Sequence, residues 1–384
     1  MTAIQLVFRF KYLMTFFMVG LLVTGCAKSD DKNVIKIGEY SSLTGTTATF
    51  GQSTHKGLEL AIAEINAAGG VNGKKLKLIT EDDQSKPEEA VTAVTKLIHR
   101  DKVDIVIGEV ASSRSLAAAP ICQSNATPMI SPSSTNPEVT QKGDYIFRVC
   151  FIDPYQGSVL ATFAAKSLKA NQVAILKDVK NDYSIGLTAF FKKTYATLGG
   201  KVVAEQAYSE GDTDFKAQLT AIKAKNPQVI FVPGYYTEVA LIVKQARELN
   251  ITVPFIGGDG WDSSKLIEIG GAAMDGCYYS NHYSADSNDP AVKKFVADFK
   301  AKYNETPDAL AALGYDAGKI AADAMRRAGT ADKTAVRDML ATTKDFAGVT
   351  GKITIDKDRN ASKSAVIVAI KGGKTLFQES VSAE

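Results

Sequence analysis

Residues 108–137 read GEVASSRSLAAAPICQSNATPMISPSSTNP and decide which fold the chain adopts. An apolar run at 103–107 precedes this stretch, and a second short apolar run lies inside it at 128–130. The Ala-rich segment at 116–122 between the two runs is typical of a helix. Two strands with a helix between them form the unit of a parallel sheet, because a parallel crossover needs a connection of about this length. The stretch therefore predicts an α/β fold.

Both apolar runs end in small hydroxyl residues instead of a charged loop. Ser112 and Ser113 come before the predicted helix, and the second run ends in Ser131, Ser133, Ser134 and Thr135. In an open α/β sheet, ligands bind outside the carboxyl ends of the parallel strands. Hydroxyl groups and the free N–H groups of a helix N-terminus suit an anion there. We therefore expect a site for a carboxylate, although the same serines are also ordinary helix caps and turn formers.

The remaining sequence repeats the alternation of short apolar runs and amphipathic helical runs. Around the opening stretch, strands are expected at 34–38, 75–80 and 145–149, and helices at 54–68 and 87–100. The pattern starts afresh after residue 154, with four expected strands at 172–176, 201–208, 229–232 and 254–256. Helices follow each of these strands, which is the sequence form of stacked βαβ units. The chain is thus expected to form two doubly wound lobes.

The C-terminal part departs from this alternation. An extended run at 277–281 is followed by two expected helices at 291–303 and 310–327, and then by further extended runs up to residue 378. A helical pair after the second sheet, followed by strands, predicts that the chain crosses between the lobes more than once. Several crossing segments would form a multi-strand hinge.

The N-terminal segment is typical of an export signal. Arg9 and Lys11 precede an apolar run at 12–23, which is shorter than the about 20 residues needed to span a bilayer. Residues 1–25 are therefore predicted to be a signal peptide. Val-Thr-Gly-Cys at 23–26 resembles a bacterial lipobox with Val in place of the usual Leu, so Cys26 is the predicted lipidation site. Cleavage of a plain signal peptide near the same place is the alternative.

The charge and the cysteines exclude some classes of protein. The formal net charge is +3 for the whole sequence, and the predicted signal peptide carries two positive charges and no negative ones. A protein so close to neutrality is not expected to bind nucleic acid. Cys122, Cys150 and Cys277 lie in apolar or helical runs and can form at most one disulfide, so buried free thiols are favoured. No metal or cofactor is expected, and His55, His99 and His282 are interpreted as surface or packing residues.

Catalytic motifs are not supported by the sequence. A hydrolase of the nucleophile-elbow type needs G-x-S-x-G with a partner histidine, and none of the three histidines follows such a turn. The segment Gly372-Gly-Lys-Thr375 lacks the glycine spacing of a phosphate-binding loop and lies between two expected strands. The protein is therefore not expected to be an enzyme.

Five motifs together carry a resemblance to a known family: IGEYSSLTG at 37–45, EINAAGGVNG at 64–73, Asp82-Asp83, PMISP at 128–132 with Thr135, and GGDGW at 257–261. From residue 35 to its end the chain resembles the periplasmic type I substrate-binding proteins of ABC transporters, in particular the group that binds leucine, isoleucine and valine. The resemblance implies two lobes that close on a ligand. Lobe 1 would comprise 34–151 and 281–348, and lobe 2 would comprise 152–280 and 349–384.

The resemblance also implies roles for matching residues. The α-carboxylate of the ligand would be held by Ser112, Ser133 and Thr135, and its α-ammonium by Asp259 with Tyr235 and Tyr183. The apolar surface against the ligand side chain would come from Phe50, Val110 and Ala111. A well-known member of the family has a glutamate in place of Asp259 and a disulfide cysteine in place of Ala111. Taken singly, the tyrosines could be core aromatics, and an acid between glycines could be a turn residue.

The expected function is that of a monomeric, extracytoplasmic lipoprotein, anchored by its lipid in the periplasm or at the cell surface. It would capture a small amino acid, with branched-chain amino acids favoured, and deliver it to an ABC transporter permease. A ligand-sensing receptor of the same fold is the alternative, as is a binding protein for another amino acid or small carboxylate. Asp259 argues against an aromatic acid without an amine, because an unpaired acid in a closed cleft costs several kcal/mol.

Overall fold

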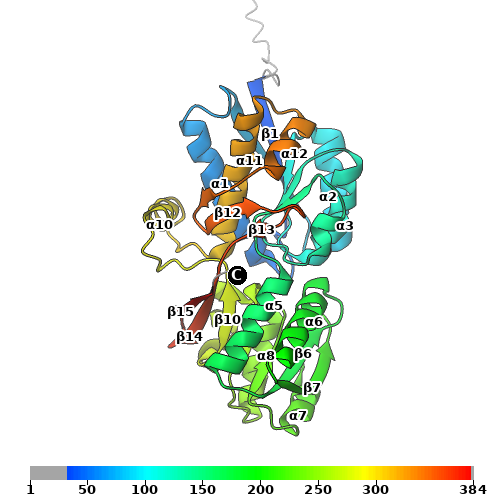
Figure 1. Ribbon diagram of the computed structural model, residues 1–384, viewed down its shortest axis with the longest axis vertical. Helices are drawn as coiled ribbons and strands as arrows, with labels where there is room; N and C mark the ends of the chain where they lie inside the picture. The colour runs from blue at the N-terminus through cyan, green and yellow to red at the C-terminus, as the bar shows by residue number, and fades with distance from the viewer. Residues whose placement is uncertain (1–32, 382–384) are drawn as a thin grey trace, which may run out of the picture. The chain divides into compact units, whose positions relative to one another are not determined.

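The computed structural model describes residues 33–381. The predicted signal peptide and the predicted lipidation site Cys26 lie outside the described residues. Figure 1 shows two sheets with helices packed on their faces, as expected for two doubly wound lobes. The boundary predictions were accurate for most strands, and the strand expected at 201–208 has those bounds in the structure.

The first sheet has the strand order β2-β1-β3-β4-β5, and all of its strands are parallel. The strands are β1 (Val34–Ser41), β2 (Lys75–Asp82), β3 (Ile105–Ile107), β4 (Met129–Ser131) and β5 (Ile146–Arg148). Side chains alternate between two cores along each strand, as the period of two requires. Ile105 and Ile107 lie in the core shared with α1 (Ala48–Ala67) and α11 (Ala309–Ala328), whereas Val106 lies in the core under α2 (Pro87–Lys96) and α3 (Ser112–Ser124).

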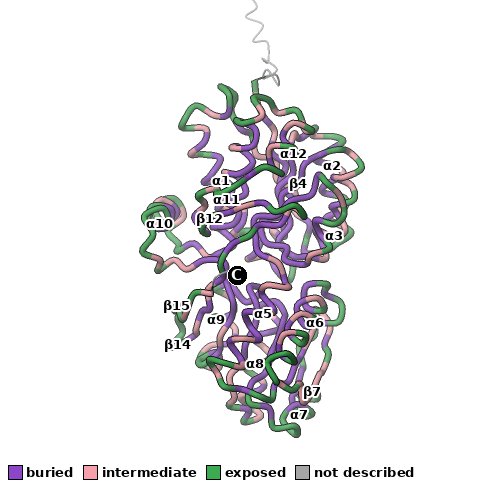
Figure 2. The backbone as a smooth tube through the Cα atoms, viewed as in Figure 1, coloured by how far each residue is buried: buried purple, intermediate pink, exposed green. Residues whose placement is uncertain are grey.

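The second sheet has the order β15-β14-β10-β9-β8-β6-β7. Its parallel strands are β6 (Gln172–Asp178), β7 (Lys201–Tyr208), β8 (Val229–Phe231), β9 (Phe255–Gly257) and β10 (Tyr278–Asn281). The hairpin of β14 (Ala365–Lys371) and β15 (Lys374–Val381) joins β10 in antiparallel pairing. The helices of this lobe are α5 (Asp153–Thr162), α6 (Asp182–Thr197), α7 (Lys216–Lys223), α8 (Tyr236–Glu248) and α9 (Ser264–Gly270). Figure 2 shows that the middle of each sheet is buried, whereas the edge strands β7 and β15 are largely intermediate or exposed.

Besides the short helix at Glu138–Gln141, two longer helices were missed because of their local sequence. Asp153-Pro154 was interpreted as the break between two lobes, but α5 begins there, since proline is well tolerated in the first turn of a helix. The helix α12 (Lys333–Ala341) lies in a polar stretch that was assigned no element. The helix α3 begins at Ser112 and not at 116, so Ser112 and Ser113 lie in its first turn instead of before it.

The chain passes between the sheets at 149–152, 282–289 and 363–364. The small sheet β11 (Phe346–Gly348), β12 (Gly351–Ile355) and β13 (Ala361–Ser362) precedes the last of these crossings. Its β12–β13 connection lies on the side of the first sheet, because Arg148 N donates to Arg359 O at 3.3 Å and Thr140 Oγ1 to Asn360 Oδ1 at 3.1 Å. We therefore propose the expected lobe boundaries with the last crossing moved from 349 to 363–364.

The remaining elements are short or lie beside the sheets. The helix α10 (Pro290–Tyr303) follows the second crossing and packs Phe295 and Phe299 with Tyr283 of the crossing segment. The other short helices are α4 (Glu138–Gln141), η2 (Leu97–Asp101), η3 (Phe163–Ser167), η4 (Asp259–Trp261) and η5 (Gly271–Met274). Of these, η4 begins at the carboxyl end of β9 and carries Asp259, the acid expected to bind the ligand ammonium.

Candidate functional site

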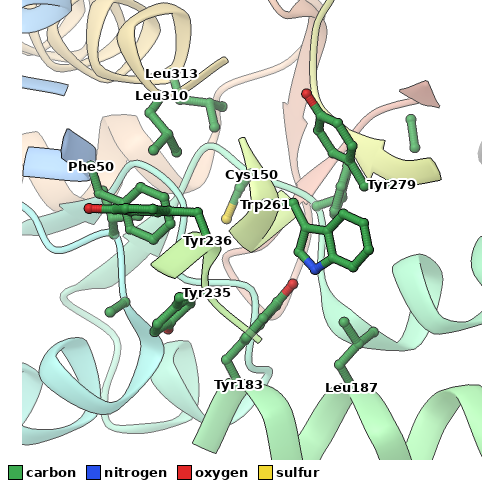
Figure 3. Close-up of a cluster of buried hydrophobic side chains, with 14 of the residues drawn as sticks. Phe50, Cys150, Tyr183, Leu187, Tyr235, Tyr236, Trp261, Tyr279, Leu310 and Leu313 are labelled. Carbon is green, nitrogen blue, oxygen red and sulfur yellow. The ribbon is translucent and has the colours of Figure 1, made fainter. Parts of the chain in front are cut away.

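A small cavity between the two sheets brings most of the predicted site residues together. It is lined by Phe50, Val110, Ser112, Ser133, Tyr183, Tyr235, Asp259, Gly260 and Leu310. Figure 3 shows four of these residues close together: Phe50, Tyr183, Tyr235 and Leu310. They come from four distant segments of the chain. Of the predicted residues, Thr135 and Ala111 do not line the cavity, and both are buried beside it.

The first lobe contributes neutral hydrogen-bonding groups. Ser112 is buried at the first position of α3, and its Oγ accepts from Asn136 N at 3.2 Å. The first backbone N–H groups of a helix lack carbonyl partners within it and can bind an anion. Ser133 Oγ points across the cavity and donates to Asp259 Oδ2 at 3.4 Å. Neither residue carries a charge, so this side of the cavity suits a carboxylate that is bound by dipoles.

The neighbouring hydroxyl residues have structural roles. Ser134 Oγ donates to Glu109 O at 2.9 Å, and Ser131 Oγ accepts from Ser134 N at 2.9 Å. For these two serines the interpretation as turn formers is the correct one. Thr135 lies against buried Asp153, whose backbone N donates to Thr135 O at 2.9 Å.

The second lobe contributes one carboxylate. Asp259 is buried, and its oxygens accept hydrogen bonds from Gln156 Nε2 at 2.8 Å, His282 Nε2 at 2.9 Å and Ser133 Oγ. Within residues 33–381, no lysine or arginine forms an ion pair with it. A buried carboxylate held only by uncharged donors retains a charge that a cation can compensate. The arrangement thus favours an ammonium group in the cavity.

The glycines around Asp259 allow close packing and do not merely form a turn. A Cβ atom on Gly258 would lie 2.2 Å from the Tyr183 hydroxyl, and one on Gly260 would lie 2.8 Å from Gly234 O. Tyr183 and Tyr235 stack with ring centroids 5.5 Å apart, and Phe50 meets Tyr235 edge-on at 5.4 Å. Burial raises the pKa of both tyrosines, so their phenols stay neutral at physiological pH.

Sequence reasoning missed four residues of the site: Gln156, His282, Leu310 and Asp153. His282 does pack, as expected, with its ring 3.7 Å from that of Phe151, but it also contacts Asp259. Its Nδ1 is buried without a partner, and burial lowers the pKa of His282, so the neutral ring donates from Nε2. Burial, with the nearby charge of Asp259, raises the pKa of Asp153 to about 8. No local motif marks these positions.

Comparison with known proteins identifies the family to which this chain belongs. The family model described as "Periplasmic binding protein" matches residues 34–374. The chain belongs to this family. It is a family of solute-binding proteins and not of catalysts. The expected fold, two α/β lobes of the type I periplasmic binding proteins, is therefore confirmed.

Individual relatives of this periplasmic binding protein cover most of its length. The leucine-, isoleucine-, valine-, threonine- and alanine-binding protein of Pseudomonas aeruginosa is 34% identical over 85% of this chain and 86% of its own. A crystal structure of the leucine-binding protein LivK of Thermotoga maritima is 41% identical with a TM-score of 0.87, covering 91% of this chain and 99% of that one. The substrate-binding protein LivJ of Streptococcus pneumoniae, solved with isoleucine, is 36% identical with a TM-score of 0.86 and the same coverage.

More distant members bind other solutes. A solute-binding protein of Rhodopseudomonas palustris, solved with 3,4-dihydroxybenzoic acid, is 25% identical with a TM-score of 0.82, covering 91% of this chain and 98% of that one. Membership of the family therefore leaves the ligand open, and the residues of the cavity must decide it.

Three further observations concern the cysteines, metal ligands and membrane spans of this periplasmic binding protein. Cys122, Cys150 and Cys277 are free and buried, as expected. Among residues 33–381, no group of three or more His, Cys, Asp and Glu side chains is placed to hold a metal ion. In the same part of the chain, no helix has the length and apolarity needed to cross a membrane.

Proposed function

We propose that this protein binds a branched-chain amino acid in the cavity and encloses it by closure of the two lobes. One observation carries the proposal: Ser112 and Ser133 from the first lobe and Asp259 from the second line the same small cavity. Neutral donors facing an uncompensated carboxylate match the two ends of a zwitterion. A ligand that touches both lobes binds the closed state more tightly than the open one and so shifts the equilibrium toward closure.

The proposed roles follow the positions of the side chains. Ser112 and Ser133 donate hydrogen bonds to the ligand carboxylate, and Asp259 accepts hydrogen bonds from the ammonium group. Thr135 packs beside the two serines without lining the cavity. Phe50, Val110 and Leu310 contact an aliphatic side chain, with Ala111 beside them and Tyr183 and Tyr235 closing the cavity. The apolar residues Phe50, Val110 and Leu310 in the lining support leucine, isoleucine or valine.

We further propose that the protein is a monomeric lipoprotein at the periplasmic or outer cell surface and delivers its ligand to an ABC transporter permease. Relatives that are named or solved as parts of such transporters support this role. The lipid anchor would be attached at Cys26. The variant Cys26→Ser is expected to move from the membrane fraction to the soluble fraction. A variant that still needs detergent for extraction would exclude anchoring at Cys26.

Two other ligand classes define the test. A benzoate-type acid would leave Asp259 without a cation in the closed cleft, which costs several kcal/mol. Titration calorimetry with leucine, isoleucine, valine, alanine, threonine and benzoate separates the cases. We expect the three branched-chain amino acids to bind most tightly and benzoate not to bind. Tight binding of benzoate and none of leucine would exclude the proposal. Loss of leucine uptake on deletion of the gene separates transport from a sensing role.

A further inference from the structure

A second set of contacts joins the two lobes away from the cavity. Glu210 lies in the turn between β7 and α7 of the second lobe, and it reaches two residues of the first lobe. Thr46 Oγ1 donates to Glu210 Oε1 at 2.6 Å, and Arg114 Nη2 lies 3.5 Å from the same oxygen. Neither Glu210 nor Arg114 nor Thr46 lines the cavity.

Arg114 is fixed by its own lobe. Its Nη1 donates to Thr47 Oγ1 at 3.0 Å, its Nη2 donates to Ser85 O at 2.9 Å, and only 3% of the side chain is exposed. The carboxylate of Glu109 lies 3.7 Å from Nη1 and compensates part of its charge within the lobe. Although burial alone lowers the pKa of the Arg114 guanidinium, nearby acidic groups, Glu109 first among them, raise it. Arg114 therefore stays charged and needs little ordering when Glu210 arrives.

We propose that Glu210 is an interlobe latch: its contacts with Arg114 and Thr46 form when the lobes close and slow the release of bound ligand. This inference rests on the proposed function, because it assumes that the cavity opens to release a ligand. A contact made only in the closed state biases the opening equilibrium without contributing to ligand selectivity. Glu210 is a positioning residue, since it acts on the lobes and not on the ligand.

The test compares Glu210→Gln with Glu248→Gln in stopped-flow binding of leucine. Glu248 is an exposed acid of the same lobe whose ion pair is with Lys216 of that lobe, so its substitution is a matched control. We expect Glu210→Gln to raise the dissociation rate about three- to tenfold, the range of a partly exposed ion pair with a charge-assisted hydrogen bond, and to change the association rate less than about twofold. A merely structural defect would not produce this division between the two rates.

Two further measurements test the latch independently of the Glu210→Gln variant alone. Thr46 is exposed, so Thr46→Val is expected to fold and to raise the dissociation rate in the same direction by a smaller factor. The dissociation rate of the wild-type protein should rise with salt more steeply than that of Glu210→Gln, because Glu210 is 30% exposed and its pair is screened. Dissociation rates of both variants within twofold of the wild type would overturn the latch while leaving the ligand proposal intact.

A failure of the ligand proposal can be distinguished experimentally from a failure of the latch. If the wild-type protein binds no amino acid in calorimetry, the ligand proposal fails on its own. The latch is then decided by energy transfer between dyes on exposed positions of the two lobes, introduced as Lys142→Cys and Lys193→Cys. Glu210→Gln must then give a lower transfer efficiency than Glu248→Gln in the ligand-free protein. Equal efficiencies would exclude the latch.

Discussion

The two sides of the cavity differ in how they are built and in what charge they present. The hydrogen-bonding groups of the first-lobe side come from one continuous stretch, 108–137, whose strand ends and helix N-terminus lie together because β3 and β4 are neighbours in the sheet, whereas its apolar residues Phe50 and Leu310 come from α1 and α11. The second-lobe side gathers Gln156, Tyr183, Tyr235 and Asp259, with His282 from a crossing segment. One side offers neutral dipoles and the other a carboxylate, so a ligand that fits both must be dipolar.

The energies of the two sides differ as well. A neutral donor that loses a charged ligand group can turn to water or to another hydroxyl, so the cost stays at about 1.5–3 kcal/mol. A buried carboxylate that loses its cation has no such substitute, and the cost is about 3–5 kcal/mol. We therefore expect substitutions on the second-lobe side to weaken binding more than those on the first-lobe side.

The largest effect is expected for Asp259→Ala. Removing the carboxylate leaves the ligand ammonium buried without a partner, which predicts a loss of leucine affinity of more than about a hundredfold. Titration calorimetry measures it, with Glu248→Gln as the control that removes an exposed acid from the same lobe. If leucine binds Asp259→Ala with an unchanged dissociation constant, the ammonium is bound elsewhere and the comparison between the two sides is wrong.

A smaller effect is expected for Ser112→Ala. A hydrogen bond to a charged group contributes about 1.5–3 kcal/mol, which predicts a ten- to hundredfold loss of affinity. Ser124→Ala is the matched control, because Ser124 is exposed at the other end of the same helix and its hydroxyl donates only to Ile121 O. Equal dissociation constants for the two variants would remove the Ser112 hydroxyl from the site.

The contrast between the two sides also explains what the sequence could predict. The hydroxyl residues of the first-lobe side lie in one stretch, so strand ends and hydroxyl residues were enough to predict an anion site at 108–137. On the second-lobe side, only the resemblance to a family pointed to Asp259 and the tyrosines. Gln156 and His282, which hold Asp259, are 103 and 23 residues away from it in the chain, and no local pattern connects them.

The boundaries of helices and strands were also predicted well only where local sequence determines them. Strands with apolar residues on both faces were found because parallel sheets are buried on both sides. The helix α5 was missed because Asp153-Pro154 indicates a break when only local propensity is considered, whereas packing against α6 and β10 stabilises a helix there. Among the serines, only the structure separates Ser133, which faces the cavity, from Ser134, which bonds within its own lobe.

The acid on the second-lobe side also makes binding sensitive to pH through His282. Burial lowers the pKa of His282 from its ordinary value of 6.5, so the ring is neutral at pH 7. Protonation would place a cation against Asp259, with Lys363 as the other nearby charge, and this cation would compete with the ligand ammonium. Leucine affinity should fall on acidification below pH 6.5, where Asp153 is already protonated, by at most about tenfold per pH unit. His282→Gln keeps a donor to Asp259 and cannot titrate, so its leucine affinity should not fall below pH 6.5; a fall equal to that of the wild type would exclude His282 as the titrating group.

The smallest effect is expected on the stability of the folded protein without ligand. It measures how much a buried acid of the second lobe destabilises the fold, independently of ligand binding. Burial, with the nearby charge of Asp259, raises the pKa of Asp153 to about 8, so the folded protein keeps a proton that the unfolded chain loses near pH 4. The folded state binds more protons between these values, and stability therefore falls as the pH rises from about 4 to about 8. Asp153→Asn removes this dependence without changing the shape of the side chain. Its melting temperature in the absence of ligand should match that of the wild type at pH 4 and exceed it by a few degrees at pH 9.

The control variant Asp144→Asn should change the melting temperature in the opposite direction. The hydrogen bond from Gln123 lowers the pKa of Asp144, so the charged form of Asp144 stabilises the fold and the variant should melt below the wild type at pH 9. A melting-temperature difference between Asp153→Asn and the wild type that does not grow with pH would show that Asp153 is ionised in the folded protein, and the second-lobe side would then carry two charges instead of one.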